Sequence, residues 1–149
     1  MMMGATVFGY ELNDETKSLL KSYLSCRGRV INTITAYMLD TRLETLDIRM
    51  KAQTENCKYI VSKLKELGQN ILYCGTGSLF LLRGYKEEDA KKLKHIPINI
   101  TYGTTYSICT PIYDFNINEF NQFDYLRFSI GLEDKELILN DIKQILKKE

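Results

Sequence analysis

The sequence contains too few metal-binding residues, too far apart, for a common zinc site. It has four cysteines, which form no Cys-x-x-Cys pair, and a single histidine, His95. A structural zinc site needs four such ligands, normally in closely spaced pairs, so we expect no zinc site, and a Cys–His nucleophile has weak support. We interpret the cysteines as reduced side chains that behave as small apolar residues. They are Cys26, Cys57, Cys74 and Cys109.

The chain also lacks an excess of one charge and a long apolar run. Its 20 basic and 19 acidic residues give a net charge of +1, so nothing points to nucleic acid or an anionic membrane as a partner. No apolar run approaches the roughly 20 residues of a membrane span. The first residues lack the basic start and long apolar core of a signal peptide. By default we expect a cytoplasmic protein.

What the chain does have is enough length and apolar content for a folded domain. Of its 149 residues, 44% are hydrophobic and 26% are charged, which is typical of globular proteins. We expect a short strand over residues 5–10, which are rich in β-branched and aromatic side chains. A helix should follow to about residue 26, capped by Asn13 or Asp14 and ended by Gly28.

A long helical pattern then extends from residue 33 to residue 67, with Gly68 as its stop signal. Its apolar residues recur at roughly helical spacing. A straight helix of this length would measure about 50 Å, at ~1.5 Å per residue. Because that exceeds the span of a small domain, we expect the helix to bend, to connect two bodies or to pack on a partner chain.

Shorter elements alternate through the rest of the chain. We expect strands over residues 70–74, 79–83, 99–102 and 125–130. A charged helix is expected over residues 86–95, an irregular segment over residues 104–123 and a final helix over residues 135–147. Asp134 is the expected N-cap of the final helix. The buried stripe of that helix should comprise Leu137, Ile138, Ile142, Ile145 and Leu146. This order of elements predicts an α/β fold.

A lone arginine on a strand is the most informative feature of the C-terminal part. Leu126, Phe128 and Ile130 fall on one face of the expected strand, and Arg127 and Ser129 fall on the other. The strand then turns at a glycine and enters the final helix through two acidic residues. Taken alone, an arginine in this position is typical of a solvated charge or a surface ion pair.

Other motifs give little support for a site. The turn Gly75-Thr76-Gly77-Ser78 lacks the lysine and the spacing of a phosphate-binding loop. Glu133 and Asp134 are adjacent, but we interpret them as helix capping rather than as an acid/base pair. The tyrosines at positions 102, 106, 113 and 125 could line a groove, although partial core packing is the favoured interpretation.

Three blocks of the sequence resemble a known family. Residues 36–39 (AYML) with 43–50 (LETLDIRM) resemble a helix of pattern AYLLLRGLKTLxLRM. Residues 101–111 (TYGTTYSICTP) resemble the pattern SLGGxESLxxHP, and residues 125–134 (YLRFSIGLED) are similar to LIRLSVGIED. These patterns belong to the Cys/Met-metabolism (transsulfuration) enzymes, which use pyridoxal phosphate (PLP) and include cystathionine γ-lyase, cystathionine γ-synthase and methionine γ-lyase.

The resemblance implies the α/β C-terminal domain of a fold-type I PLP-dependent enzyme, a small sheet flanked by helices with one long connecting helix. It implies a remnant of the large PLP domain over residues 1–30, the connecting helix over residues 31–68 and the C-terminal domain over residues 69–149. It also implies that Arg127 binds the α-carboxylate of the substrate, because a guanidinium presents a rigid donor fork that matches a carboxylate. Thr101, in place of a serine, and Tyr102 would assist in substrate binding.

The rest of the family's active site has no counterpart in this sequence. The cofactor lysine stands in a Ser-x-Thr-Lys context in the family, and no lysine here has that context. The nearest lookalike, Thr16-Lys17-Ser18, lies in an expected polar helix turn. The family's connecting-helix Arg-Gly pair is Thr41-Arg42, its lysine is Glu44 and a later histidine is Gln53. These departures put the family's usual packing in doubt.

Three hypotheses follow and stay open. The chain could be the C-terminal half of a PLP-dependent C–S lyase or transsulfuration enzyme that acts on a sulfur amino acid. PLP would then be bound only in complex with a companion chain that supplies the lysine, and we expect an oligomer. Alternatively, the chain could be a non-catalytic, degenerate homologue that serves as an oligomerisation or regulatory partner of a complete relative. It could also be a fragment of a complete enzyme.

Overall fold

The protein comprises two compact units, Met1–Leu43 and Glu44–Glu149. The structure is a computed structural model and describes residues 11–27, 32–101, 103–112 and 125–146. The strand expected over residues 5–10 and the stop signal at Gly28 lie outside the described residues.

The described residues of the N-terminal unit form the helices α1 (Asp14–Cys26) and α2 (Thr33–Leu43). Asn13 caps α1, because its side-chain oxygen accepts a hydrogen bond from the Thr16 backbone amide at 2.8 Å. The sequence prediction of this helix and its cap is confirmed. Asn32 accepts a similar bond, also 2.8 Å long, from the backbone amide of Thr35 at the start of α2. Both helices are therefore specified by local capping.

The long helical pattern forms two helices rather than one. Helix α2 ends at Leu43, and α3 (Leu46–Glu66) begins after a turn at residues 44–45. Just before the break, the Thr41 hydroxyl donates to the backbone carbonyls of Tyr37 and Met38, a local bond that often bends helices. Gly68 ends the helical region as expected, with φ of 74°. No helix in the described part of the chain combines the length and the apolar character needed to cross a membrane.

The C-terminal unit is built on a four-stranded sheet in the order β1-β2-β4-β3, with every neighbouring pair antiparallel. The strands are β1 (Ile71–Leu72), β2 (Leu79–Arg83), β3 (Ile108–Ile112) and β4 (Tyr125–Ser129). The strand expected over residues 99–102 is wrong for residues 99–101, the part of it that the structure describes, and Ile98 forms an isolated bridge with Cys109. Strand β3 lies instead in the segment expected to be irregular. It tolerates Pro111 because it is an edge strand.

The expected charged helix over residues 86–95 is much shorter, because a distant side chain reorganises its second half. Helix α4 spans only Glu87–Ala90. The buried Asp141 carboxylate accepts hydrogen bonds, each 2.9 Å long, from the backbone amides of Lys94, His95 and Ile96. Three amides that converge on one carboxylate adopt a turn rather than a helix, so this prediction is wrong beyond residue 90.

Helix α5 (Lys135–Lys143) closes the described chain. Asp134 caps it as predicted, since its Oδ1 atom accepts from the backbone amides of Glu136 and Leu137. The buried stripe is only partly as predicted. Ile138, Ile142 and Ile145 are buried and Leu146 is half-buried. Leu137, however, is 46% exposed, and Leu139 is buried in its place.

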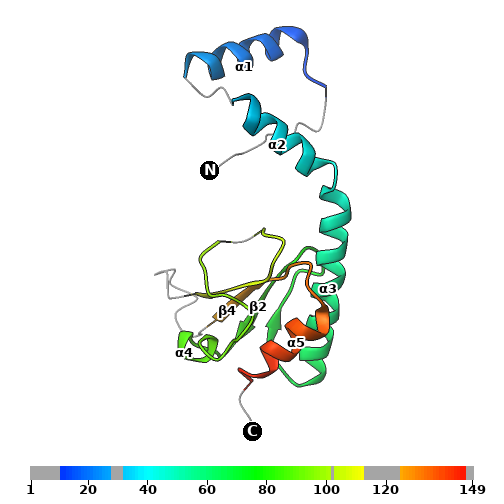
Figure 1. Ribbon diagram of the computed structural model, residues 1–149, viewed down its shortest axis with the longest axis vertical. Helices are drawn as coiled ribbons and strands as arrows, with labels where there is room; N and C mark the ends of the chain where they lie inside the picture. The colour runs from blue at the N-terminus through cyan, green and yellow to red at the C-terminus, as the bar shows by residue number, and fades with distance from the viewer. Residues whose placement is uncertain (1–10, 28–31, 102, 113–124, 147–149) are drawn as a thin grey trace. The chain divides into compact units, whose positions relative to one another are not determined.

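The core lies between one face of the sheet and the helices α3 and α5, which lie side by side (Figure 1). Leu126, Phe128 and Ile130 are fully buried in it, as the alternation of strand β4 predicted. The ring of Phe128 stacks on that of Phe80, with ring centroids 5.2 Å apart. This packing fixes which face of β4 points away from the helices.

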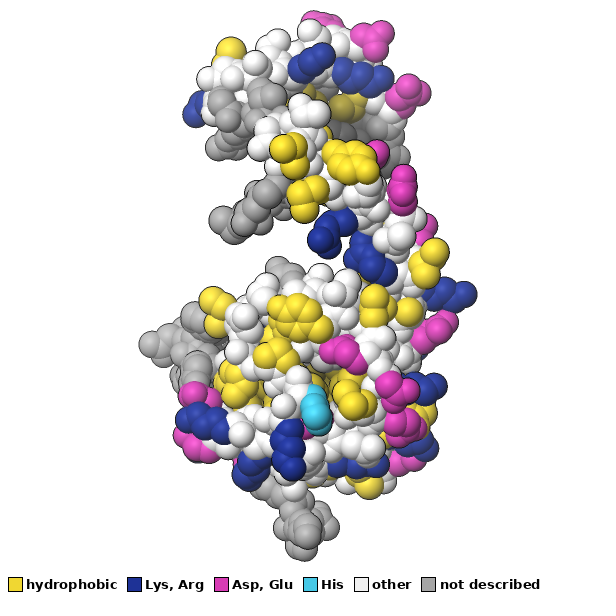
Figure 2. All heavy atoms as spheres, in the orientation of Figure 1, with side chains coloured by type: hydrophobic (Ala, Val, Ile, Leu, Met, Phe, Trp, Pro, Cys, Tyr) yellow, Lys and Arg dark blue, Asp and Glu magenta, His cyan; other side chains and the backbone are white. Residues whose placement is uncertain are grey.

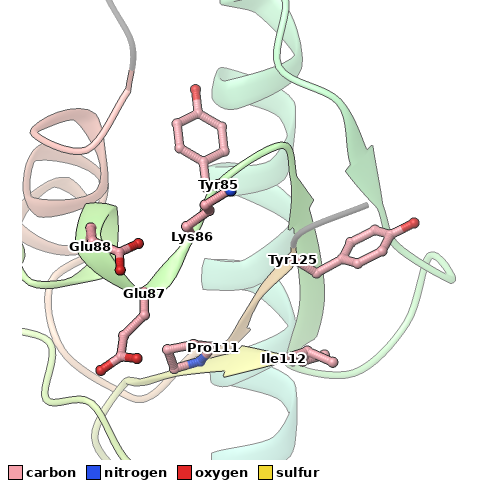
Figure 3. Close-up of a pocket in the computed structure, with 7 residues that line it drawn as sticks. All are labelled: Tyr85, Lys86, Glu87, Glu88, Pro111, Ile112 and Tyr125. Carbon is pink, nitrogen blue, oxygen red and sulfur yellow. The ribbon is translucent and has the colours of Figure 1, made fainter. Parts of the chain in front are cut away.

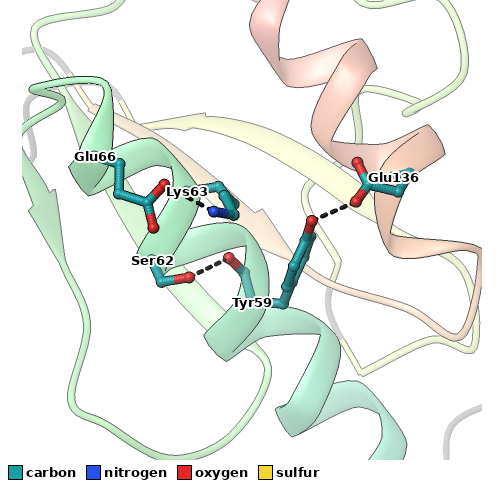
Figure 4. A network of polar contacts seen from close by, with 5 residues as sticks. All are labelled: Tyr59, Ser62, Lys63, Glu66 and Glu136. Atoms are coloured by element: carbon teal, nitrogen blue, oxygen red, sulfur yellow. Dashed lines mark hydrogen bonds and ion pairs between the residues drawn. The ribbon is translucent and has the colours of Figure 1, made fainter.

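Polar contacts join α3 to α5 at the surface of the same unit. The Tyr59 hydroxyl of α3 donates to a carboxylate oxygen of Glu136 in α5, and within α3 Lys63 pairs with Glu66 at 2.8 Å (Figure 4). The hydrogen bond to Glu136 raises the pKa of Tyr59 above its usual value. The Lys135 ammonium lies 4.6 Å from the centroid of the same tyrosine ring.

Candidate functional site

Arg127 lies at the centre of the sheet, on the face opposite the core. In the register of β4 it pairs with Leu81 of β2 and with Thr110 of β3. Strand alternation directs its side chain away from α3 and α5, and it is half-buried. The Arg127 guanidinium is therefore flanked by strands on both sides.

The guanidinium is held by neutral oxygen atoms of the same unit. The Arg127 Nη2 atom donates to the carbonyl of Ile100 at 3.1 Å, to that of Thr101 at 3.2 Å and to the Thr110 hydroxyl at 3.0 Å. The structure thus brings Arg127 and Thr101 together, through the backbone of Thr101. Tyr102, the third predicted site residue, lies outside the described residues.

Thr110 is part of this site, although no signal in the sequence selected it. The Thr110 hydroxyl donates to the Asn99 carbonyl and accepts from Arg127. The pairing is set by the register of β3 on β4. Because residues 104–123 were expected to be irregular, only the sheet places Thr110 opposite Arg127.

A second polar cluster holds the chain that follows Thr101. The Glu133 carboxylate accepts from the backbone amide of Ser107 at 2.5 Å and from its hydroxyl at 3.0 Å. The Ser107 hydroxyl in turn accepts from the Gly131 amide at 2.9 Å. The capping role expected for Glu133 is therefore wrong, and Asp134 alone of this pair caps α5. A Cβ atom at position 131 would lie 2.5 Å from the Tyr106 carbonyl carbon, so this close approach requires glycine.

Helix α3 contributes two amide side chains to the same cluster. The Gln53 amide nitrogen donates to the Thr104 carbonyl at 2.7 Å. The Asn56 amide nitrogen donates to the carbonyls of Gly131 and Glu133, at 3.2 and 3.0 Å. Gln53 is 4% exposed, so this contact is buried and costly to lose. The segment beside the Arg127 guanidinium is therefore anchored to both α3 and the turn before α5.

The described lysines do not fit a covalent link to PLP. All of them are exposed apart from Lys63, which is half-buried. Its hydrogen bond to Glu66 raises the pKa of Lys63, whereas a Schiff-base lysine needs a lowered pKa. Lys17, of the lookalike motif, is exposed in α1, with its ammonium 3.8 Å from carboxylate oxygens of Glu11 and Asp14.

The buried cysteines are also poorly suited to nucleophilic chemistry. Burial raises the pKa of Cys57 and that of Cys109 to about 12, so both remain protonated at neutral pH. Cys26 and Cys74 are exposed thiols. Among residues 11–27, 32–101, 103–112 and 125–146, no group of three or more His, Cys, Asp or Glu side chains could hold a metal ion.

A small pocket of about 200 Å³ opens near the ends of strands β3 and β4 (Figure 3). It is lined by Tyr85, Lys86, Glu87, Glu88, Pro111, Ile112 and Tyr125. Small-molecule sites commonly measure ~300–1,000 Å³, so this pocket is smaller than most. Arg127 is not among its lining residues, and the pocket does not belong to the arginine site.

Comparison with known proteins supports the fold without a match in sequence. No family model and no curated protein match the chain. Solved structures do match. A cystathione gamma lyase (CalE6) from Micromonospora echinospora has a TM-score of 0.79 and 14% identity, over 89% of this chain and 43% of its own. The cystathionine gamma-lyase from yeast has a TM-score of 0.73 and 18% identity, with the same coverage.

A cystathionine gamma synthase from Xanthomonas oryzae pv. oryzae, in complex with aminoacrylate and cysteine, has a TM-score of 0.73 and 17% identity, again over 89% of this chain and 43% of its own. The chain thus spans less than half the length of the structures that it matches. It has the fold of the C-terminal part of fold-type I PLP-dependent enzymes, and this prediction from the sequence is confirmed.

Proposed function

We propose that the chain forms the C-terminal part of a PLP-dependent enzyme that acts on a sulfur amino acid, and that Arg127 binds the α-carboxylate of this substrate. The observation that carries the proposal is the position of Arg127. It is the central side chain on the face of the sheet opposite the core, in a fold shared with transsulfuration enzymes.

A fixed guanidinium suits this role for two physical reasons. Its N–H groups can form two parallel, charge-assisted hydrogen bonds with one carboxylate. A substrate held in this way has a defined orientation of the bonds at its Cα atom, which determines what reacts when a cofactor is bound nearby. The contacts of Nη2 with Ile100, Thr101 and Thr110 involve uncharged acceptors, so they orient the guanidinium without neutralising its charge. A carboxylate that binds through two parallel hydrogen bonds would replace one of these contacts with a charge-assisted bond. Thr101 and the backbone near Tyr102 would complete the substrate site.

A companion chain would supply the cofactor lysine, and the two would act as an oligomer in the cytoplasm. The described lysines of this chain do not fit that role, as shown by their exposure and by the pairing of Lys63. Exposed apolar side chains on α1 and α2 favour association with another chain. Hydrophobic side chains are visible at the surface of the N-terminal unit, to which these helices belong (Figure 2). The reaction would be elimination or replacement at Cβ or Cγ.

A second candidate is a non-catalytic partner that regulates or assembles with a complete relative. Two observations favour it. Arg127 already donates to carbonyls of its own chain, at Ile100 and Thr101. Gln53, in place of the family's histidine, is buried in a hydrogen bond with the Thr104 carbonyl.

The proposal is tested by purification of the chain together with a candidate companion that ends near a cofactor lysine, in the presence of PLP. The mixture should show the visible absorbance of protein-bound cofactor and should release a keto acid from a sulfur amino acid, whereas neither chain alone should do so. Arg127→Ala should raise KM roughly ten- to a hundredfold, because it removes a charged hydrogen-bonding partner.

Arg83→Ala is a matched control, since Arg83 is also a half-buried arginine of this sheet, at the end of β2. It should leave KM within about twofold of the wild-type value. A complex that binds cofactor but releases no keto acid would favour the non-catalytic partner. An active complex whose KM is unchanged by Arg127→Ala would refute the role assigned to Arg127.

A further inference from the structure

The hydroxyl of Thr110 is fixed in space by the sheet. Thr110 stands directly across from Arg127 in the β3–β4 pair and is 9% exposed. Its Oγ1 atom lies 3.0 Å from Nη2 of Arg127. A β-branched side chain on a paired strand has few available rotamers. The acceptor that faces the guanidinium is therefore held in place by the backbone.

The direction of the hydrogen bonds at this hydroxyl is also fixed. A hydroxyl has one hydrogen and two lone pairs, and the hydrogen of Thr110 is donated to the Asn99 carbonyl. The oxygen must then accept from Arg127, and donors and acceptors linked in such a chain strengthen one another.

The same hydroxyl also fixes the segment that carries the other two acceptors of Nη2. Asn99 is held by the Thr110 hydroxyl on its carbonyl and by its own amide, which donates to the Cys109 carbonyl at 3.0 Å. The next two carbonyls, of Ile100 and Thr101, accept from Arg127. The Thr110 hydroxyl therefore contacts Arg127 directly and also helps to hold the segment that carries two further acceptors of Nη2.

We propose that Thr110 is a positioning residue, whose hydroxyl holds the Arg127 guanidinium in one orientation on the face of the sheet opposite the core. The consequence for substrate binding rests on the proposed function, in which Arg127 binds a carboxylate. An arginine side chain has many rotamers, and a donor fork that is ordered before binding loses less entropy when a carboxylate arrives.

The first test measures the order of the guanidinium by NMR of the full chain labelled with ¹⁵N-arginine. Arg127→Lys identifies the Arg127 signals by their disappearance. Rotation of the guanidinium should be slow in the wild type, rapid in Thr110→Val, which removes the hydroxyl at nearly constant volume, and slow again in Thr110→Ser. Thr110→Ala removes the same hydroxyl without a large side chain and replaces the valine variant if that variant does not fold.

Thr54→Val is the matched control, because the Thr54 hydroxyl bonds only within α3, to the Met50 carbonyl at 2.7 Å. It should leave the rotation of Arg127 unchanged. Equal rotation in the wild type and in both variants that lack the Thr110 hydroxyl would overturn the proposal, and so would a failure of Thr110→Ser to restore the order.

The second test titrates the same proteins with sodium acetate and follows the Arg127 signals. The dissociation constant should rise roughly five- to tenfold in Thr110→Val and return toward the wild-type value in Thr110→Ser, as expected for the loss of one hydrogen bond that orients a charged group. If acetate shifts Arg127 in no protein while the rotation still depends on Thr110, the positioning role stands and the proposed carboxylate ligand fails.

Discussion

The two units of the protein are stabilised in different ways. In Glu44–Glu149, two helices cover one face of a sheet, and buried side chains such as Leu82 and Phe128 form a continuous core. In the described part of Met1–Leu43, α1 has no buried residue and α2 buries only Thr35. Large apolar side chains of these helices are exposed, including Leu19 at 70% and Ile34 at 74%.

This difference teaches that helix capping and helix burial are separate matters. Helix α1 has a well-formed N-cap at Asn13 and acidic residues in its first turn, so its local signals are as good as those of α5. Local signals, however, supply only a small part of the stability of a helix, and most comes from packing of an apolar face. The N-terminal helices have such side chains, and in the proposed function another chain would cover them.

The largest expected effect is that of a buried leucine compared with an exposed one. Leu82→Ala should lower the free energy of unfolding of the C-terminal unit by about 2–5 kcal/mol, because Leu82 is fully buried and its removal leaves a cavity. Leu19→Ala, the same substitution at an exposed position, should change it by less than about 0.5 kcal/mol. Unfolding in urea, monitored by circular dichroism, measures both changes in the free energy of unfolding. If both substitutions lowered the free energy of unfolding by a similar amount, the difference between the units would be refuted, because α1 would then share the core of the other unit.

A smaller effect is expected when the two helix caps are removed. Asp134→Ala should lower the free energy of unfolding by about 1 kcal/mol, because α5 belongs to the folded core and loses a carboxylate that caps two amides. Asn13→Ala should reduce the helical signal of α1 and leave the main unfolding transition in place. Hydrogen exchange of the two helices separates the outcomes, and a shift of the main transition by Asn13→Ala would contradict the independence of the units.

At neutral pH the smallest effect on stability is expected from the buried thiols, and this effect becomes larger only at alkaline pH. Cys26, which is exposed, should react with a thiol reagent at neutral pH, whereas Cys57 and Cys109 should react only after unfolding. The folded pKa values of the two buried thiols, about 12, exceed the ordinary value of 9.0. Because the unfolded chain then releases protons first, stability should fall as pH rises from about 9 to about 12. Thermal melts at several pH values across this range measure this loss of stability, and a constant melting temperature would argue against burial of these thiols.

Features that depend on neighbouring residues could be predicted from the sequence. The caps at Asn13 and Asp134 and the helix stop at Gly68 act within one turn, so the residues that cause them are adjacent in the chain. The two faces of β4 could be assigned because side chains alternate along any strand. The role proposed for Arg127 came from the resemblance of its surroundings to a family and not from this alternation.

Features that depend on distant residues were decided by the tertiary structure. The helix expected over residues 86–95 is cut short by Asp141, which lies 45 to 47 positions after the amides that it binds. Strand β3 was missed because it lies in a segment whose Thr, Tyr and Asn content predicted irregular structure. It contains Pro111, which a strand tolerates at the edge of a sheet, and no local signal identifies an edge. Glu133 was wrongly expected to cap a helix, because its true partner, Ser107, is a distant residue.

The sequence by itself therefore determined that Arg127 stands on a strand with its side chain opposite the core. Only the tertiary structure decided what holds the guanidinium, since the hydroxyl of Thr110 reaches it through the register of β3 on β4 and the carbonyls of Ile100 and Thr101 reach it from the segment before β3. The physical reason is the range of the interactions. Alternation and capping act over a few residues, whereas strand register joins segments whose separation in the chain carries no information about their contact.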